Sequence, residues 1–263
     1  MELIGRISRG TKMDQIYIPK NRTGLASGEY VLIMPLTSKQ EKTPRQFKPY
    51  LYNLKNLEPI KLKITEEIFN LVNKNLEPEN IIITGSFLEP GFRFNDIDIL
   101  ILTERKINTG MLNEKISSMT GIKTHIISLN SKTLISGLSS DPIYNMMLSK
   151  CLSSKRLIFN VKRKINYKLL DLSLLKSKSL IDNFEILNGN EKYYLTLNMV
   201  SILLFIQGRK LSKDIVNKET EKLFSIKIND IKENLVKRDF LKKYKETYNR
   251  TFNLIMESIK HEK

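Results

Sequence analysis

The chain has 263 residues and carries 44 Lys and Arg against 28 Asp and Glu, a formal net charge of +16 at pH 7. This length provides an ample hydrophobic core for one large domain or for two to three small ones. The single cysteine, Cys151, excludes an internal disulfide and suits a reducing compartment. We find no signal peptide, and the longest apolar stretch, 193–206, is too short to span a membrane. We therefore predict a cytoplasmic protein without a membrane partner.

The basic excess is spread along the chain. Residues 1–160 contain 22 basic against 15 acidic side chains, and residues 161–263 contain 22 against 13. Such a field attracts polyanions and makes nucleic acid a natural partner. A solvated lysine-rich surface explains the same composition, and an enzyme that binds a nucleoside triphosphate (NTP) also needs positive charge. The charge alone therefore leaves the partner open.

Residues 1–36 have the pattern of a small β unit. Turn residues separate three short strand candidates at 4–8, 15–19 and 30–35. The segments 15–20 (Gln-Ile-Tyr-Ile-Pro-Lys) and 28–31 (Gly-Glu-Tyr-Val) resemble landmarks of SpoVT/AbrB-type domains, which bind DNA or dimerise. The stretch between them is shorter than that family usually has, so a β-hairpin extension is the alternative interpretation.

The rest of the chain divides into an α/β segment and a helical segment. A polar linker at 37–49 precedes a helix at 60–73, whose apolar residues follow helical spacing. We predict strands at 81–84, 96–102 and 121–129, with a helix around 109–119. A helix at 141–152 and a strand at 156–159 follow, and residues beyond 161 are all helical. The predicted class is α/β (α+β), with a small β unit at 1–40, a mixed-sheet core at 41–160 and a basic helical domain at 161–263.

One stretch of the predicted core, residues 81–99, contains candidate metal-binding and phosphate-binding residues. A strand ends at Gly85 and Ser86, and nine residues later a second strand opens with Asp96 and Asp98. Because strand side chains alternate between faces, the two carboxylates point the same way. Two carboxylates on one face can hold hard divalent cations, which also bind phosphate oxygens. The turn at Gly85 and Ser86 offers N–H groups and a hydroxyl to such a phosphate.

These residues, Gly85-Ser86 and then Asp96-Ile97-Asp98-Ile99, resemble the motif of the nucleotidyltransferase superfamily over about residues 60–160. That family includes DNA polymerase beta, CCA-adding enzymes and the minimal nucleotidyltransferases. The resemblance implies transfer of a nucleoside monophosphate from an NTP to a hydroxyl, with loss of pyrophosphate and with Mg²⁺ or Mn²⁺ as cofactor. By this resemblance Asp96 and Asp98 bind the metal, and Gly85 and Ser86 bind the triphosphate. Arg93, between the Gly85-Ser86 turn and the strand that opens at Asp96, is a further candidate for phosphate contact.

The sequence departs from the family at the third carboxylate. Family members usually carry one on a later strand, and the strand 121–129 has neither Asp nor Glu. His125 stands at the corresponding place, where a neutral imidazole binds metal or accepts a proton. The alternative is that His125 is an ordinary, partly buried histidine and that the third acid is absent. Glu104 and Asp141 are weaker candidates for the same role.

The resemblance implies a nucleotidyltransferase but leaves its acceptor open. The basic helical domain favours RNA as the acceptor, with a protein acceptor as the second choice, and homodimerisation is left open. The missing acid and the AbrB-like segment favour a different class. In that class the fold binds nucleotide with little or no catalysis, and the protein acts as a DNA-binding regulator or an antitoxin-like protein.

Overall fold

The computed structural model describes residues 7–16, 31, 33, 47–92, 94–158 and 161–261. The chain forms two compact units, residues 1–43 and 44–263. In the first unit, β1 (Ile7–Ser8) and β2 (Gln15–Ile16) pair as an antiparallel two-stranded sheet, which confirms β structure at these positions. At 30–35 the described residues, Val31 and Ile33, lie in neither helix nor strand. Most of the AbrB-like segments lie outside the described residues, so that resemblance stays a prediction.

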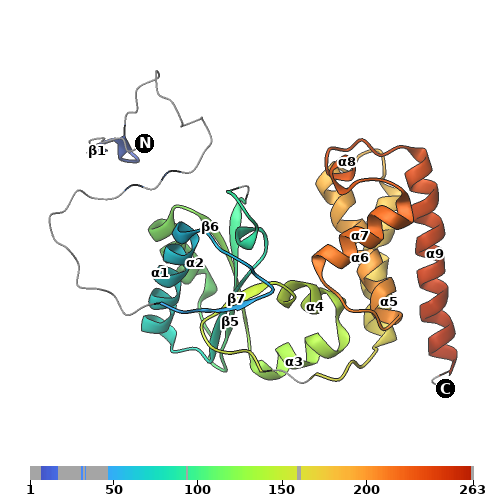
Figure 1. The fold of residues 1–263 in the computed structure, drawn as a ribbon, viewed down its shortest axis with the longest axis horizontal. Coiled ribbons are helices and arrows are strands. Elements are labelled where there is room, and N and C mark those ends of the chain that lie inside the picture. The colour runs from blue at the N-terminus through green and yellow to red at the C-terminus, as the bar shows by residue number, and fades with distance from the viewer. Residues whose placement is uncertain are drawn as a thin grey trace. The chain divides into compact units, whose positions relative to one another are not determined.

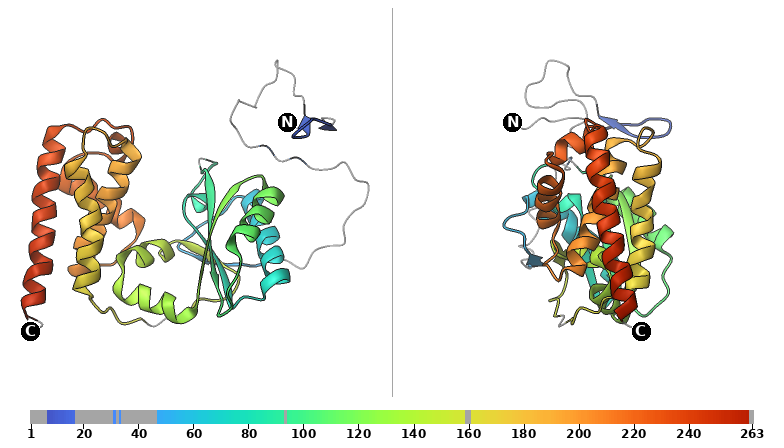
Figure 2. Two further views of the ribbon diagram at one scale, coloured as in Figure 1. Left: turned by 180° about the vertical axis from the view of Figure 1, so that it is seen from behind. Right: turned by 90° about the vertical axis from the view of Figure 1, so that its right-hand side faces the viewer.

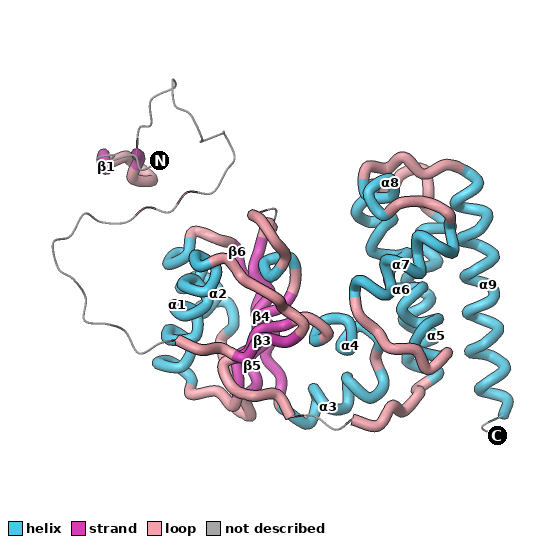
Figure 3. The backbone as a smooth tube through the Cα atoms, viewed as in Figure 1, coloured by secondary structure: helices cyan, strands magenta, loops and turns pink. Residues whose placement is uncertain are grey.

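The second unit is built on a five-stranded mixed sheet (Figure 1, Figure 3). In spatial order its strands are β3 (Tyr50–Tyr52), β7 (Cys151–Ser153), β4 (Asn80–Thr84), β5 (Asp96–Leu102) and β6 (Lys123–Leu129). Strands β5 and β6 are parallel, and every other neighbouring pair is antiparallel. The predicted mixed-sheet class is confirmed.

Helices cover both faces of this sheet (Figure 1). On one face, α1 (Pro59–Leu76) and α2 (Thr109–Thr120) pack on side chains that include Ile97 and Ile99. On the other face, Leu100 and Leu102 share a core with side chains of α3 (Ser131–Ser140) and α4 (Pro142–Leu148). Because β5 alternates, Asp96 and Asp98 lie on the α3–α4 face. The two acids therefore share their face of β5 with Leu100 and Leu102, and the opposite face of the strand is apolar.

Two details of the predicted core were wrong. The predicted strand 156–159 is a loop over 156–158, where the Leu157 N–H donates to the Tyr52 hydroxyl at 2.6 Å. The closing strand is β7 instead, and the predicted helix 141–152 ends with α4 at Leu148. Strand β3 lies just beyond the predicted linker and was missed. Both missed strands have three residues. Strand β3 pairs with β7, and β7 pairs with both β3 and β4, so local sequence gives little sign of them.

The remaining helices form the C-terminal region, as predicted (Figure 2). They are α5 (Tyr167–Asp182), α6 (Gly189–Ile206), α7 (Lys213–Phe224), α8 (Ile228–Lys232) and α9 (Arg238–His261). Their core includes the fully buried Tyr244, whose hydroxyl donates to the Ser177 carbonyl at 2.9 Å. The apolar stretch 193–206 lies in α6, most of which is buried. Among the described residues no helix combines the length and apolarity that crossing a membrane requires.

Candidate active site

The turn after β4 requires a glycine. Gly85 has φ of +83° and ψ of −161°, a conformation open essentially to glycine alone. A Cβ added at this position would lie 2.2 Å from Asp98 Oδ2. The backbone of Gly85 therefore lies directly against the Asp98 carboxylate. Ser86 follows as the first residue of the short 3₁₀ helix η1 (Ser86–Leu88).

Three predicted site residues converge beside this turn. Asp98 and His125 are directly opposite each other in the parallel β5–β6 register. The Nδ1 atom of His125 is 3.4 Å from Asp96 Oδ2 and 3.6 Å from Asp98 Oδ1. One ligand atom from each of the three side chains lies within 4.8 Å of the other two. The sequence prediction that placed His125 with the two acids is thus consistent with the geometry, whereas the chemical role of each residue stays a proposal.

The two carboxylates are in unfavourable surroundings for a pair of negative charges. Burial raises the pKa of Asp98 above its ordinary value, the charge of Asp96 raises it further, and His125 acts in the opposite direction. The side chains keep contact with solvent, with exposed fractions of 28% for Asp96 and 45% for Asp98. The site is therefore reachable from solution and would gain from a bound cation that balances the charge.

The donor set fits a divalent cation. Carboxylate oxygens are the ligands that Mg²⁺ and Mn²⁺ prefer, and imidazole suits the first-row transition metals. Three protein ligands at a partly exposed position leave coordination places for water or phosphate oxygens. Among the described residues, the group formed by Asp96, Asp98 and His125 is the only one with three metal-binding side chains this close together.

The other acidic candidates do not join this group. Glu104 follows the far end of β5, where its carboxylate accepts a long 3.5 Å contact from Asn130 Nδ2. Asp141 caps the start of α4, and its Oδ1 accepts a hydrogen bond from the Ile143 N–H at 2.8 Å. A third carboxylate at the site is therefore absent from the described part of the chain. Arg93 lies outside the described residues.

Sequence reasoning missed a basic contact at the loop that follows η1. Lys213, at the first position of α7, pairs with Glu89 at 2.7 Å. Burial works to raise the pKa of Glu89, but the hydrogen bond and charge of Lys213, with the charges of Lys150 and Lys232, hold that pKa below its ordinary value. Lys213 thus contacts Glu89 directly, and the charges of Lys150 and Lys232 act on the same carboxylate. They are far apart in sequence, so no local pattern reveals them.

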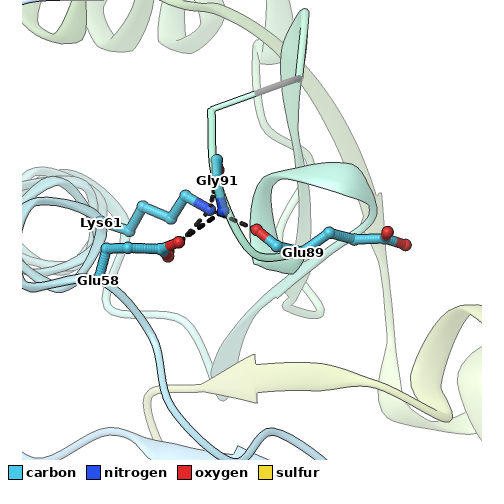
Figure 4. Close-up of polar contacts among 4 residues, drawn as sticks. All are labelled: Glu58, Lys61, Glu89 and Gly91. Atoms are coloured by element: carbon cyan, nitrogen blue, oxygen red, sulfur yellow. Dashed lines mark hydrogen bonds and ion pairs between the residues drawn. The ribbon is translucent and has the colours of Figure 1, made fainter.

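A second missed feature is the pair Glu58 and Lys61 (Figure 4). Lys61 is fully buried and reaches the same loop from α1. Its sequence position gives a signal, since Lys61, Thr65, Ile68 and Val72 follow the helical spacing of a buried face and all four are fully buried.

The comparisons with known proteins add little to this site. No protein-family model matches the sequence, and no curated protein matches it. Among solved structures, the chain is similar to spectinomycin adenyltransferase AAD(9) from Enterococcus faecialis, crystallised with ATP and spectinomycin. That similarity has a TM-score of 0.41 and 15% sequence identity, and it covers 76% of this chain and 100% of the other. A similarity this distant assigns no function to this chain.

Proposed function

We propose that the protein is a metal-dependent nucleotidyltransferase that moves a nucleoside monophosphate from an NTP to a hydroxyl acceptor and releases pyrophosphate. The convergence of Asp96, Asp98 and His125 beside the Gly85 turn carries this proposal. A pair of carboxylates facing a phosphate-binding turn is the arrangement that metal-assisted phosphoryl chemistry uses. The resemblance of this motif to the nucleotidyltransferase superfamily supports the same reaction.

Each residue has a defined part in the proposed site. Asp96 and Asp98 would bind the cation through their carboxylate oxygens, and Ser86 would donate its hydroxyl to a phosphate oxygen. The bound cation would balance the charge of the triphosphate and of the leaving pyrophosphate. Lys213, Lys150 and Lys232 add positive charge that acts on Glu89, in the loop after η1.

His125 would take the place of the usual third carboxylate. Its Nδ1 is the nitrogen that faces both acids, so this atom would bind the cation or accept the proton from the attacking hydroxyl. In the reaction, the acceptor oxygen bonds to the α-phosphorus while the bond from that phosphorus to the bridging oxygen of pyrophosphate breaks. The proton of the hydroxyl leaves to His125 or to water.

For the acceptor we propose RNA, with protein as the second candidate. The observation that favours RNA is the basic excess of the C-terminal region, with 22 basic and 13 acidic side chains over 161–263. Such a surface attracts a polyphosphate chain in a salt-dependent way. A protein acceptor needs no such field, so the salt dependence of transfer separates the two.

The test is incubation of the protein with each α-labelled NTP, Mg²⁺ or Mn²⁺, and total RNA or total protein from cells. We expect label on RNA, sensitive to ribonuclease. Label on protein would replace RNA by the second candidate.

The competing class is a fold that binds nucleotide without catalysis, and the observation that favours it is His125 in place of a carboxylate on β6. Metal-dependent NTP binding with no transfer to either acceptor would establish that class. In that case the protein would be a regulator of the kind suggested by its AbrB-like N-terminal segment.

A further inference from the structure

Lys61, a fully buried lysine of α1, forms hydrogen bonds with the loop that leads from η1 to the strand β5. The Nζ of Lys61 donates to the carbonyl of Glu89 at 2.5 Å and to the carbonyl of Gly91 at 2.7 Å. Residues 89–92 are called the connecting loop below. Figure 4 shows both hydrogen bonds and the side chain that reaches across from the helix. Lys61 therefore binds the connecting loop through backbone carbonyls.

Glu58 binds both Lys61 and the same loop. Its Oε2 lies 3.1 Å from Lys61 Nζ, and its Oε1 accepts the Gly91 N–H at 2.6 Å. Both backbone polar groups of Gly91 therefore bond to the Glu58–Lys61 pair. Burial works to raise the pKa of Glu58, but the hydrogen bonds from backbone groups and from Lys61 hold that pKa below its ordinary value. The carboxylate is consequently ionised at neutral pH.

Aromatic rings enclose the ammonium. Lys61 Nζ lies 5.8 Å from the ring centre of Phe87, 5.3 Å from that of Phe92 and 5.5 Å from that of Phe94. These distances are within the range of cation–π attraction. Phe87 lies in η1 itself, and Phe92 and Phe94 lie in the segment that joins η1 to β5. The lysine therefore contacts this segment through its carbonyls and through its aromatic side chains.

Packing alone does not explain a lysine at this place. A buried cation is costly unless it is paired and fully hydrogen-bonded, and an apolar side chain of similar size would fill the space at lower cost. What a lysine adds is directional, because its ammonium donates hydrogen bonds to two loop carbonyls, which an apolar side chain cannot do. The same loop is held from its other side by the Lys213–Glu89 ion pair.

We propose that Lys61 is a positioning residue, which sets the connecting loop so that Gly85 and Ser86 face Asp96 and Asp98 at the distance a metal-bound triphosphate requires. This role rests on the proposed function. The loop is part of the covalent link between the phosphate-binding turn and the metal-binding strand. Lys61 itself touches neither metal nor nucleotide.

The test compares Lys61→Met with Lys63→Met. Methionine keeps the length and apolar stem of lysine and removes its donors, and Lys63 is an exposed lysine on the same helix. The measurements are hydrogen exchange of the Gly91 amide and calorimetric titration of Mn²⁺ with ATP, CTP, GTP or UTP. Both are made well below the unfolding temperature. We expect Lys61→Met to exchange Gly91 at least about tenfold faster and to bind the nucleotide about tenfold more weakly, with Lys63→Met unchanged.

A second variant covers the case in which Lys61→Met does not fold. Glu58→Gln combined with Lys61→Met removes both charges together and keeps an amide oxygen for the Gly91 N–H, so neither partner is left as an unpaired ion. The same loss of nucleotide affinity is expected in this variant. Unchanged exchange at Gly91, or unchanged affinity in a folded Lys61 variant, would overturn the positioning role alone. A wild-type protein that binds none of the four nucleotides would overturn the proposed function and the positioning role with it.

Discussion

Gly85 and Asp98 lie so close together that a Cβ at position 85 would stand 2.2 Å from Asp98 Oδ2. The two residues belong to adjacent antiparallel strands, and Thr84 is the partner of Asp98 in the register. The phosphate-binding turn and the metal-binding carboxylate of the proposed site are therefore in direct contact. Any side chain at position 85 has to move the carboxylate or the turn.

The first prediction follows from this contact. Gly85→Ala should weaken binding of NTP with Mn²⁺ at least about tenfold, because the methyl group displaces Asp98 and because φ of +83° costs of order 1–3 kcal/mol for alanine. The matched control is Gly121→Ala. Gly121 also has a positive φ, of +71°, but a Cβ there meets nothing within 4 Å. Calorimetric titration should show reduced affinity in the first variant only. Equal affinity in both variants would mean that the Gly85 turn has no contact with nucleotide.

The second prediction concerns Asp98 and stability. The folded-state pKa of Asp98 is raised above its ordinary value of 3.8, so the folded protein holds this proton more tightly than the unfolded chain does. The contribution of Asp98 to the free energy of unfolding is therefore most favourable below pH 3.8, and it declines as the pH rises through the raised pKa. In EDTA at pH 7, Asp98→Asn should be at least as stable as wild type, whereas below pH 3.8 that advantage should vanish. Urea unfolding at both pH values measures this, and a variant clearly less stable at pH 7 would contradict it.

The third prediction addresses His125. If its Nδ1 binds metal or accepts the proton, His125→Ala should reduce transfer by about 10²–10⁴-fold without a comparable loss of stability. His125→Asp should retain transfer with Mg²⁺, since it restores a carboxylate at the position facing Asp98. Single-turnover rates per folded molecule are the measurement. A His125→Ala protein with the wild-type rate would place the third ligand elsewhere.

The elements that carry the candidate site could be predicted because they are defined by local sequence. Strand β5 is an apolar run with acids at alternate positions, and Gly85 and Ser86 directly follow another apolar strand. The predicted strands at 81–84, 96–102 and 121–129 correspond to β4, β5 and β6 for this reason. His125 was proposed because it stands where the nucleotidyltransferase superfamily usually carries a third carboxylate. In the structure the parallel pairing of β5 with β6 puts it opposite Asp98.

The features that the sequence did not reveal depend on contacts between distant residues. Strands β3 and β7 have three residues each, and their paired residues are 99–103 positions apart in the sequence. The segment 156–158 resembles a strand in sequence, yet its Leu157 N–H donates to the Tyr52 hydroxyl and the segment is a loop. Likewise, the partners of Lys61 and Lys213 are loop atoms whose location depends on the complete fold.

The fourth prediction tests the contact between α7 and the connecting loop. The pKa of Lys213 is raised, because the hydrogen bond and charge of Glu89 outweigh the lowering effect of its burial, and the pKa of Glu89 is lowered. The pair therefore stabilises the fold between the ordinary values of 4.5 for Glu and 10.5 for Lys. Its effect is lost as the pH falls through the lowered pKa of Glu89 or rises through the raised pKa of Lys213.

A double-mutant cycle with Glu89→Gln and Lys213→Met isolates this pair. Because both side chains are about two-fifths exposed, we expect a coupling of only about 0.2–1 kcal/mol at pH 7. The coupling should approach zero at a pH low enough to protonate Glu89. Urea unfolding of the four proteins provides the values, and a coupling that persists in strong acid would show that the interaction is not ionic.

The most direct test of the proposed activity follows the two ends of the triphosphate separately. The protein is incubated with Mn²⁺, an RNA acceptor and an NTP labelled at either the α- or the γ-phosphorus, alongside Asp96→Asn. We expect the α-label to join the acceptor while the γ-label appears in pyrophosphate. We expect Asp96→Asn, which removes one metal-binding charge with little change in volume, to do neither while remaining folded. Equal transfer by wild type and Asp96→Asn, or γ-label on the acceptor, would contradict nucleotidyl transfer at this site.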